Sequence, residues 1–161
     1  MKRFISAALI AAMAAGTVSQ FPLQATAAGN SYELENGTIY DAGENTTKVL
    51  SLTGASGGKV IDLKDAGDSV TISANMASAG MYKLTLRYSQ SFDEGGKYQN
   101  ILINGENIGQ IQCAYTGQNK FAEVSTLAYL DKGANKITIQ GSWGWTYLDK
   151  LTIDKLVFFC V

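Results

Sequence analysis

A strict alternation of apolar and polar residues is the feature that most restricts how this 161-residue chain can fold. Residues 82–88 place Tyr or Leu at every second position, with Lys, Thr and Arg between them. Successive side chains of a β-strand point to opposite faces of a sheet, so this run predicts a strand with one buried face. Similar or shorter runs occur at 32–38, 59–63, 70–74, 98–103, 108–113, 121–127, 136–140 and 150–154.

Glycine-rich turns separate these runs. Asn104-Gly105 between two apolar strands is the clearest hairpin signal, because both residues accept the positive φ of a tight turn. No stretch after residue 28 has helical periodicity over three turns, and the single proline is Pro22. Many short strands joined in this way predict an all-β fold, a sandwich or a barrel.

Residues 1–28 have the pattern of an export signal. Lys2 and Arg3 precede an apolar run over 4–15, and Ala25 and Ala27 have the small-residue spacing of a cleavage site. The run is too short to cross a bilayer, which needs roughly 20 apolar residues. We therefore expect a secreted protein without a membrane anchor, with one domain over residues 29–161.

The charge balance excludes several classes of function. The chain has 13 basic residues, so loss of Lys2 and Arg3 leaves 11 against 14 acidic residues, a net charge of 11 − 14 = −3. Without a basic cluster, nucleic-acid binding is not expected. Histidine is absent, which excludes Ser-His-Asp and Cys-His catalysis and any zinc site with histidine ligands.

Two cysteines, Cys113 and Cys160, remain. In an exported protein they could form a disulfide, but two cysteines do not define a disulfide framework. The sequence leaves this pairing open, as it does whether the terminal run 157–161 is a native end.

Three acidic residues stand in unfavourable positions. Glu33 and Glu35 are two apart on a predicted strand, so both carboxylates leave the same face and repel each other. Asp149 shares its predicted face with the apolar Leu151 and Ile153, where an unpaired carboxylate is costly. If the last strand pairs with the first, the three could surround one hard cation such as calcium. A solvated strand face, a turn cap at Asp149 and a glycosidase acid–base pair are the alternatives.

Both tryptophans lie in a loop that glycine interrupts. Trp143 and Trp145 flank Gly144 between two predicted strands, where an exposed aromatic platform is more typical than a core position. Indole faces stack on sugar rings, and nearby amides and phenols can bind the hydroxyls. Other loop residues that could join such a surface are Tyr40, Gln90, Phe92, Tyr115, Gln118 and Asn119.

These segments, taken in order, resemble one family. The segments are 32–37 (YELENG), 55–63 (ASGGKVIDL), 80–89 (GMYKLTLRYS), 101–105 (ILING) and 148–153 (LDKLTI). Together they are similar to family 35 carbohydrate-binding modules, a family that is related to family 6. The resemblance extends over residues 31–153. Residues 90–99 and the tryptophan loop are most similar to modules attached to mannan-degrading enzymes. Family 6 modules place an asparagine before the last strand, where this chain has Thr146 and Tyr147.

The resemblance implies a β-sandwich jelly roll with a structural Ca²⁺. It assigns the ion to Glu33, Glu35 and Asp149, with main-chain carbonyls from residues 56–59. It places the sugar site at the loop end of the sandwich. The residues expected there are Tyr40, Gln90, Tyr115, Gln118, Trp143 and Trp145.

The leading hypothesis is a non-catalytic, monomeric module that brings a secreted glycoside hydrolase to plant cell-wall polysaccharide. Mannan is favoured, with xylan as a second candidate. Arg87 is the only arginine after residue 28, which disfavours uronic acids. An adhesive or structural cell-surface domain and a small glycoside hydrolase are the alternatives. The sequence does not distinguish chain-end from internal recognition or give the number of calcium ions.

Overall fold

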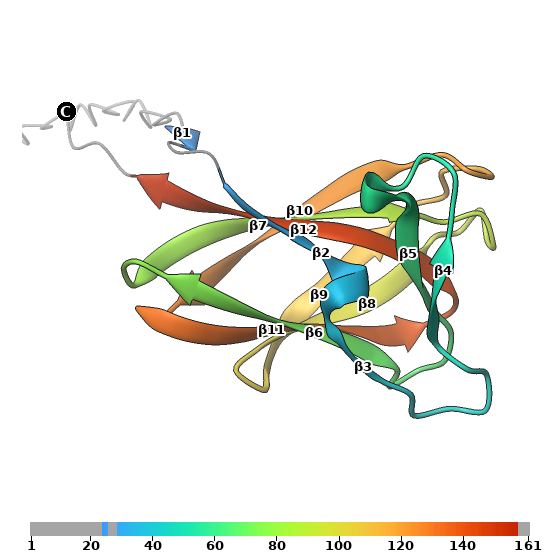
Figure 1. Cartoon of the computed structure of the whole chain (residues 1–161), viewed down its shortest axis with the longest axis horizontal. Helices are drawn as coiled ribbons and strands as arrows, with labels where there is room; N and C mark the ends of the chain where they lie inside the picture. Colours follow the sequence, from blue (N-terminus) through green and yellow to red (C-terminus); the bar gives the residue numbers. More distant parts are fainter. Residues whose placement is uncertain (1–23, 26–28, 158–161) are drawn as a thin grey trace, which may run out of the picture.

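The structure, a computed structural model, describes residues 24–25 and 29–157. Two antiparallel sheets pack face to face (Figure 1). The larger sheet has the order β10-β7-β12-β5-β4, and β1 and β2 also pair with β12. Its strands are β1 (Gln24–Ala25), β2 (Asn30–Glu33), β4 (Lys48–Ser51), β5 (Lys59–Leu63), β7 (Gly80–Ser89), β10 (Ala122–Leu130) and β12 (Thr146–Val157).

The second sheet has five strands in the order β3-β6-β11-β8-β9. They are β3 (Thr38–Tyr40), β6 (Ser69–Met76), β8 (Lys97–Ile103), β9 (Glu106–Cys113) and β11 (Gly133–Trp143). Two short 3-10 helices, η1 (Leu34–Asn36) and η2 (Ser56–Gly58), lie beside the larger sheet. The prediction of an all-β sandwich of the jelly-roll type is confirmed.

The core fills the space between the sheets. In β7, Tyr82, Leu84 and Leu86 are buried, and Ile137 and Ile139 of β11 face them from the other sheet. The residues between these positions are more exposed, as the alternation in the sequence predicts. Burial of these side chains is the main stabilising contribution to a sandwich of this kind.

Strand β12 is the centre of the larger sheet, because it pairs with β1, β2, β5 and β7. Its register with β7 shifts between Leu148 and Lys150, so Asp149 is the extra residue of a β-bulge. Leu148 and Asp149 are therefore both buried although they are adjacent in sequence. The pairing of the last strand with the first, which the calcium hypothesis requires, is present: Lys150 lies opposite Glu33.

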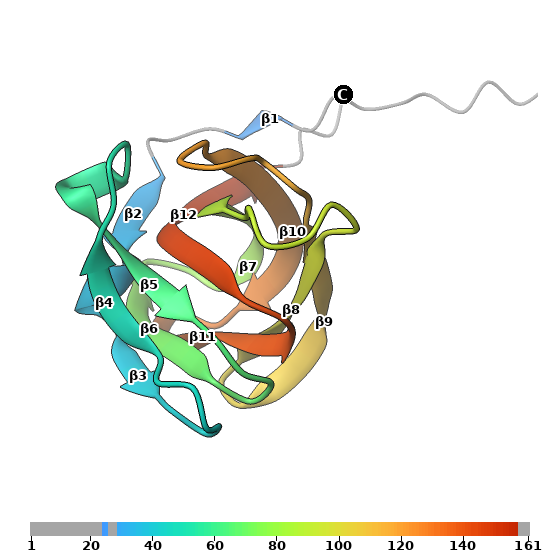
Figure 2. The same cartoon turned by 90° about the vertical axis from the view of Figure 1, so that its right-hand side faces the viewer.

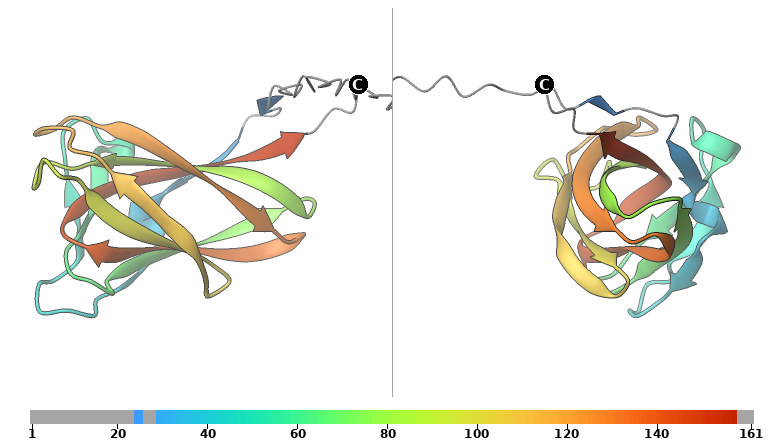
Figure 3. Two further views of the ribbon diagram at one scale, coloured as in Figure 1. Left: turned by 180° about the vertical axis from the view of Figure 1, so that it is seen from behind. Right: turned by 90° about the vertical axis from the view of Figure 1, so that its left-hand side faces the viewer.

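Five loops meet at one end of the sandwich, which we call the loop end (Figures 1 and 2). They join β3 to β4, β5 to β6, β7 to β8, β9 to β10, and β11 to β12. The β8–β9 hairpin and the β6–β7 and β10–β11 turns, which connect the two sheets, lie at the opposite end, as the two views in Figure 3 also show.

The predicted strand over 32–38 is wrong in its middle. Leu34–Asn36 forms η1, whose start buries Leu34 against the core. Glu33 is thus the last residue of β2 and Glu35 belongs to a helix, so the two do not share a strand face.

The predicted export signal lies outside the described residues except for Gln24–Ala25, which forms β1 and pairs with the end of β12. Within residues 24–25 and 29–157, no helix has the length and apolar character needed to cross a membrane.

Candidate sugar-binding surface and carboxylate cluster

The β11–β12 turn, which connects the two sheets, displays both tryptophans at the loop end. Trp143 is 53% exposed and Trp145 is 38% exposed. Gly144 between them has φ of 75°, a left-handed conformation that favours glycine and lets the chain reverse tightly. The predicted exposure of both side chains is confirmed.

Trp143 rests on a buried lysine. The Lys97 ammonium lies 3.6 Å from the centre of the indole and 3.1 Å from a carboxylate oxygen of Asp93. Lys97 also packs against Gly144, where an added Cβ would come within 2.5 Å of the lysine Cδ. Because the cation–π contact covers part of the ring, Trp143 is held in place while more than half of it faces solvent.

Trp145 belongs to a second aromatic group. The Lys64 ammonium lies 4.0 Å from the centre of its ring and pairs with Asp62 at 3.0 Å. The Phe92 ring meets Trp145 edge to face, with 5.7 Å between the centroids, and also contacts Tyr147 at 5.1 Å. The two tryptophans thus have different supports, and the β11–β12 turn presents two adjacent aromatic patches instead of one stack.

Three further predicted residues are exposed at the same end. Tyr40 ends β3 and is 64% exposed, and Tyr115 in the β9–β10 loop is 46% exposed. Gln118 lies in the same loop and is also exposed. Their place at the loop end agrees with a role in ligand binding, which remains a prediction.

Gln90 requires a correction, because it is fully buried. Its side-chain oxygen accepts hydrogen bonds from the backbone N–H groups of Phe92 and Asp93, and its amide nitrogen donates to the carbonyl of Asp93. A buried amide with these bonds shapes the β7–β8 loop that carries Phe92 and cannot contact a surface-bound sugar.

The three predicted carboxylates lie around η2. Ser56 donates its hydroxyl to Glu33 at 2.7 Å and its backbone N–H to Asp149 at 2.9 Å. An added Cβ at Gly57 would lie 3.0 Å from a Glu35 carboxylate oxygen and 3.8 Å from one of Glu33. The loop before β5 is therefore the segment that brings the acidic groups together.

Asp149 also has a cationic partner that sequence reasoning did not assign. Its second oxygen accepts from and pairs with Arg87 of the neighbouring strand β7. Arg87 in turn donates to the carbonyl of Gly54 at 3.0 Å and lies over the ring of Phe121. Because Asp149 is fully buried and already paired, it is not placed to act as an acid or base on a polysaccharide.

The negative charges of this carboxylate cluster are only partly balanced by cations and hydrogen-bond donors. Burial, reinforced by the charges of Glu33 and Asp149, raises the pKa of Glu35. Burial also raises the pKa of Asp149, although Arg87 opposes the rise. Glu33 and Glu35 each keep one buried carboxylate oxygen without a hydrogen-bond partner. Unpaired hard oxygen donors of this kind suit a calcium ion.

The side chains alone do not form a closed metal site. Among the described residues, no group of three or more His, Cys, Asp or Glu side chains has the arrangement of a metal centre. An ion here would need the two unpaired glutamate oxygens together with main-chain oxygens of the η2 loop.

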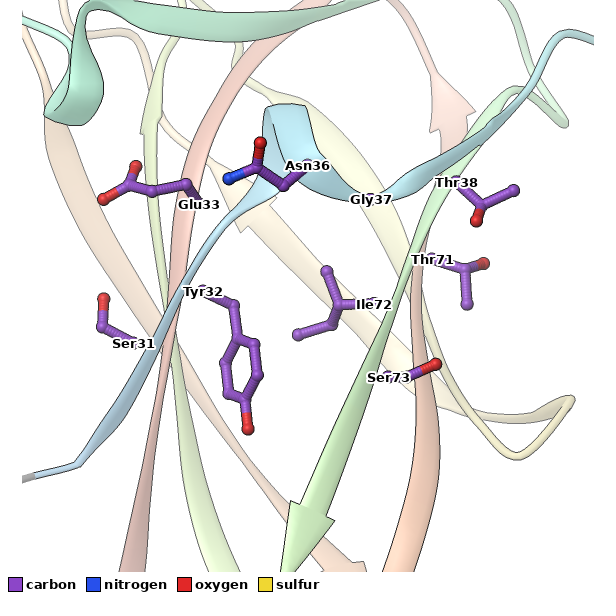
Figure 4. A pocket seen from close by; sticks show the side chains of 9 residues that line it. All are labelled: Ser31, Tyr32, Glu33, Asn36, Gly37, Thr38, Thr71, Ile72 and Ser73. Carbon is purple, nitrogen blue, oxygen red and sulfur yellow. The ribbon is translucent and has the colours of Figure 1, made fainter.

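A separate groove of about 490 Å³ lies between β2 and β6 at the open edge of the sandwich (Figure 4). The side chains of Tyr32 and Ile72 point toward each other inside it, whereas Glu33 points to the other side of β2. Hydroxyl groups dominate its lining, which consists of Ser31, Tyr32, Glu33, Asn36, Gly37, Thr38, Thr71, Ile72 and Ser73. It contains none of the exposed aromatics of the loop end.

Comparison with known proteins defines the class. The family of carbohydrate binding modules (family 35) matches residues 30–156. The chain belongs to this family, as the motifs in its sequence predicted.

The relatives carry this module as one part of a longer protein. Mannan endo-1,4-β-mannosidase B of Piromyces sp is 36% identical over 125 residues, which are 76% of this chain and 21% of that enzyme. Mannan endo-1,4-β-mannosidase A of the same organism is 33% identical over 125 residues, 76% of this chain and 19% of the enzyme. The chain thus spans about a fifth of the length of these relatives.

Solved structures confirm the fold. A family 35 carbohydrate binding module from Clostridium thermocellum matches with a TM-score of 0.71 and 22% identity, over 79% of this chain and 98% of that one. A GH26-CBM35 β-(1,4)-mannanase from Podospora anserina also matches with a TM-score of 0.71 and 22% identity, over 83% of this chain and 29% of the enzyme.

Proposed function

We propose that this chain is a non-catalytic module that holds a secreted glycoside hydrolase on plant cell-wall polysaccharide, with mannan as the favoured ligand. The observation that carries the proposal is the exposed pair Trp143 and Trp145, each fixed by a lysine beneath its ring. Aromatic faces fixed before the ligand arrives lose little conformational entropy on binding. The two mannosidases that contain a similar segment support mannan as the ligand.

Trp143→Ala and Trp145→Ala test this role. We expect wild-type protein to be retarded in native gels that contain galactomannan, and each variant to bind about tenfold more weakly, because truncating an aromatic anchor costs more than ~1 kcal/mol. Tyr129→Ala is the control, since Tyr129 is 59% exposed near the end of β10 that lies away from the loop end. A xylan gel run in parallel reports on the second candidate ligand.

Equal retardation of the Trp143→Ala/Trp145→Ala double variant and the wild type would contradict the proposal. No retardation of the wild type by either polysaccharide would favour an adhesive domain. Release of reducing sugar by the purified protein would instead support an enzyme.

The proposal includes a structural Ca²⁺ held by Glu33 and Glu35, with Asp149 and carbonyls of the η2 loop completing its surroundings. The ion would neutralise the unpaired glutamate oxygens and fix the loop beside β2. It would supply no chemistry, since the cluster is part of the scaffold. Its support is the pair of buried oxygens without a partner.

Gly57→Ala tests the ion, with Gly58→Ala as a matched control. Both glycines have positive φ, 64° and 78°, so an alanine at either site costs roughly 1 kcal/mol of backbone strain. Only the Gly57 methyl would meet the glutamates, because an added Cβ at Gly58 has nothing within 4 Å. We expect calcium to raise the melting temperature of wild type and Gly58→Ala, and to have a much smaller effect on Gly57→Ala. Identical melting curves of wild type with calcium and with chelator would exclude the ion.

A further inference from the structure

We infer that Arg87 is a built-in counter-ion of the carboxylate cluster formed by Glu33, Glu35 and Asp149. It stabilises this cluster while no calcium is bound, and it weakens the binding of calcium when the ion is present. This inference rests on the calcium ion of the proposed function and assigns a role to a residue that is not a ligand of that ion.

Three segments hold the Arg87 side chain in place. Its Nη1 pairs with Asp149 of β12, and its Nη2 donates to the carbonyl of Gly54 at 3.0 Å, in the loop before η2. Its guanidinium carbon lies 4.2 Å from the centre of the Phe121 ring, just before β10. A planar guanidinium suits these partners, because its N–H groups serve two acceptors while its face stacks on a ring. With 24% of the side chain exposed, the charge lies mostly out of water beside the cluster.

The cluster carries more negative charge than its cations balance. Arg87 is the one cation that forms an ion pair with a member of the cluster, within the ranges that the structure describes (24–25 and 29–157). Of the other cations nearby, Lys150 lies opposite Glu33, and Lys59 favours the ionised form of Glu35. The three carboxylates and the guanidinium together carry 1 − 3 = −2, the charge that one Ca²⁺ neutralises. Arg87 thus supplies the first positive charge, and the remainder matches a single divalent ion.

Asp149 connects Arg87 to the two glutamates. One of its oxygens pairs with Arg87, and the other accepts the backbone N–H of Ser56 at 2.9 Å. The hydroxyl of Ser56 is bound to Glu33 at 2.7 Å, and the buried oxygens without a partner belong to Glu33 and Glu35. A cation at Asp149 therefore reduces the repulsion among the carboxylates of the empty cluster. The same cation would repel a calcium ion at the glutamate oxygens, so its effect has opposite signs in the two states.

Two other roles for Arg87 predict different results. An arginine that only ties β7 to its neighbours would stabilise the protein equally with and without calcium. An arginine that orients Asp149 as a calcium ligand would stabilise the calcium-loaded protein more. A counter-ion stabilises the calcium-free protein more, because the bound ion takes over its role. Arg87 would in that case keep the module folded in surroundings that are poor in calcium.

Arg87→Met separates these roles by thermal melting in a chelator and in calcium chloride. We expect the melting temperature to fall by roughly 10–15 °C in chelator, because a buried carboxylate loses its partner, and by about half as much in calcium. Lys83→Met is the matched control, since Lys83 lies on the same face of β7 and opposite Asp154. It removes the same charge away from the cluster and should lower both melting temperatures equally and little. Equal losses for Arg87→Met in the two buffers, or a larger loss in calcium, would overturn the inference.

Calcium titration calorimetry gives a second readout, which a merely structural role would not change. Arg87→Met should bind calcium about tenfold more tightly than wild type, because a repelling charge is removed. Arg87→Lys keeps the charge without the planar fork, so it should bind calcium like wild type although it melts at a lower temperature. Unchanged or weaker calcium binding by Arg87→Met would contradict the counter-ion role.

A double variant decides the question if Arg87→Met does not fold in chelator. Adding Glu35→Gln removes one carboxylate and restores the net charge of the wild-type cluster, so the double variant should fold, and its failure to fold would overturn the inference. Absence of calcium binding by the wild type would overturn the inference together with the calcium ion. The polysaccharide-binding role is tested separately, by retardation of the wild type and the tryptophan variants in galactomannan gels.

Discussion

Asp68 shows how one buried charge can organise two loops of the loop end. It is fully buried, and its carboxylate accepts hydrogen bonds from the hydroxyl of Thr47 and from the backbone N–H groups of Ala42, Gly43 and Asp65. Burial opposes ionisation of Asp68, but these four bonds together lower its pKa below the usual 3.8. The carboxylate thus ties the β3–β4 loop, which follows Tyr40, to the β5–β6 loop.

Asp68→Asn replaces the carboxylate with a neutral amide. The N–H groups of this amide would face backbone N–H groups, which need an acceptor. We expect a loss of about 2–3 kcal/mol in the free energy of unfolding at pH 7, measured by urea denaturation. Because the pKa of Asp68 is lower in the folded protein, its stabilising effect is present above about pH 4 and declines as the pH falls through the folded-state pKa. The difference in the free energy of unfolding between variant and wild type should therefore become smaller below pH 4.

Asp131→Asn is the control at an exposed aspartate of the opposite end, and should change stability by less than about 0.5 kcal/mol. A pH-independent effect of Asp68→Asn would argue against the role of its charge.

At the residue scale, the sequence predicted exposure better than function. Trp143 and Trp145 were recognisable because glycine separates them in a loop, whereas Gln90 has no feature that distinguishes a buried amide from a surface one. Lys97 was not predicted as a support, although it shares the alternation of buried Gln99 and Ile101 and could have been recognised as a buried cation. Arg87 could not be assigned to Asp149, since that contact depends on strand neighbours.

Cys113 is a further single residue whose properties follow from burial. Burial raises its pKa to about 12, so little thiolate exists at neutral pH. Cys113 forms no disulfide within the part of the chain that the structure describes, and Cys160 lies outside it. Their pairing stays a prediction.

At the scale of elements, the β11–β12 turn depends on the absence of a side chain at Gly144. A methyl group there would come within 2.5–2.7 Å of the Lys97 side chain, which would have to leave its place under Trp143. The backbone of this turn and the cation–π contact are therefore coupled.

Gly144→Ala should weaken binding to galactomannan roughly fivefold, because loss of a cation–π support of ~1 kcal/mol lets Trp143 reorient. Gly133→Ala is the matched control: its φ is 93°, so it suffers similar backbone strain, and an added Cβ there meets nothing within 4 Å. Affinity gel electrophoresis of the two variants makes the comparison. Equal affinities would show that the lysine does not position the indole.

Elements were predicted well wherever alternation continued without interruption, as in β6, β7 and β11. The prediction failed at Leu34–Asn36, where a buried leucine between two glutamates gives the same alternating pattern in a strand and in a single helical turn. The bulge at Asp149 was not predicted, although adjacent Leu148 and Asp149 mark the point where the alternation changes phase.

At the scale of the whole molecule, stability depends on the sheet centred on β12. Leu151 of that strand is 1% exposed and lies opposite Leu86 of β7. Leu151→Ala should lower the free energy of unfolding by about 2–5 kcal/mol, the usual cost of a cavity in a packed core. Leu127→Ala on β10, where the leucine is 48% exposed, should cost less than about 1 kcal/mol. Urea denaturation compares them, and similar losses would contradict the central role of β12.

The sandwich class was predictable from many alternating strands with glycine turns, but the order of strands was not. Alternation determines which face of a strand is buried and gives no information on its neighbours. The order β3-β6-β11-β8-β9 is what places Gln140, Asn100 and Gln110 side by side on three strands. Such neighbours can be found only when the pairing is known.

The direct continuation of the β11–β12 turn into β12 has a consequence for the lifetime of the protein. A ligand held by Trp143 and Trp145 adjoins the strand that joins most of the larger sheet, so movement of the turn and opening of the core are linked. A ligand at a hundred times its dissociation constant adds about 2.7 kcal/mol to stability, which lowers the unfolded population about a hundredfold. Proteases that cleave unfolded chains would then degrade the module slowly while it occupies polysaccharide and quickly once it is released.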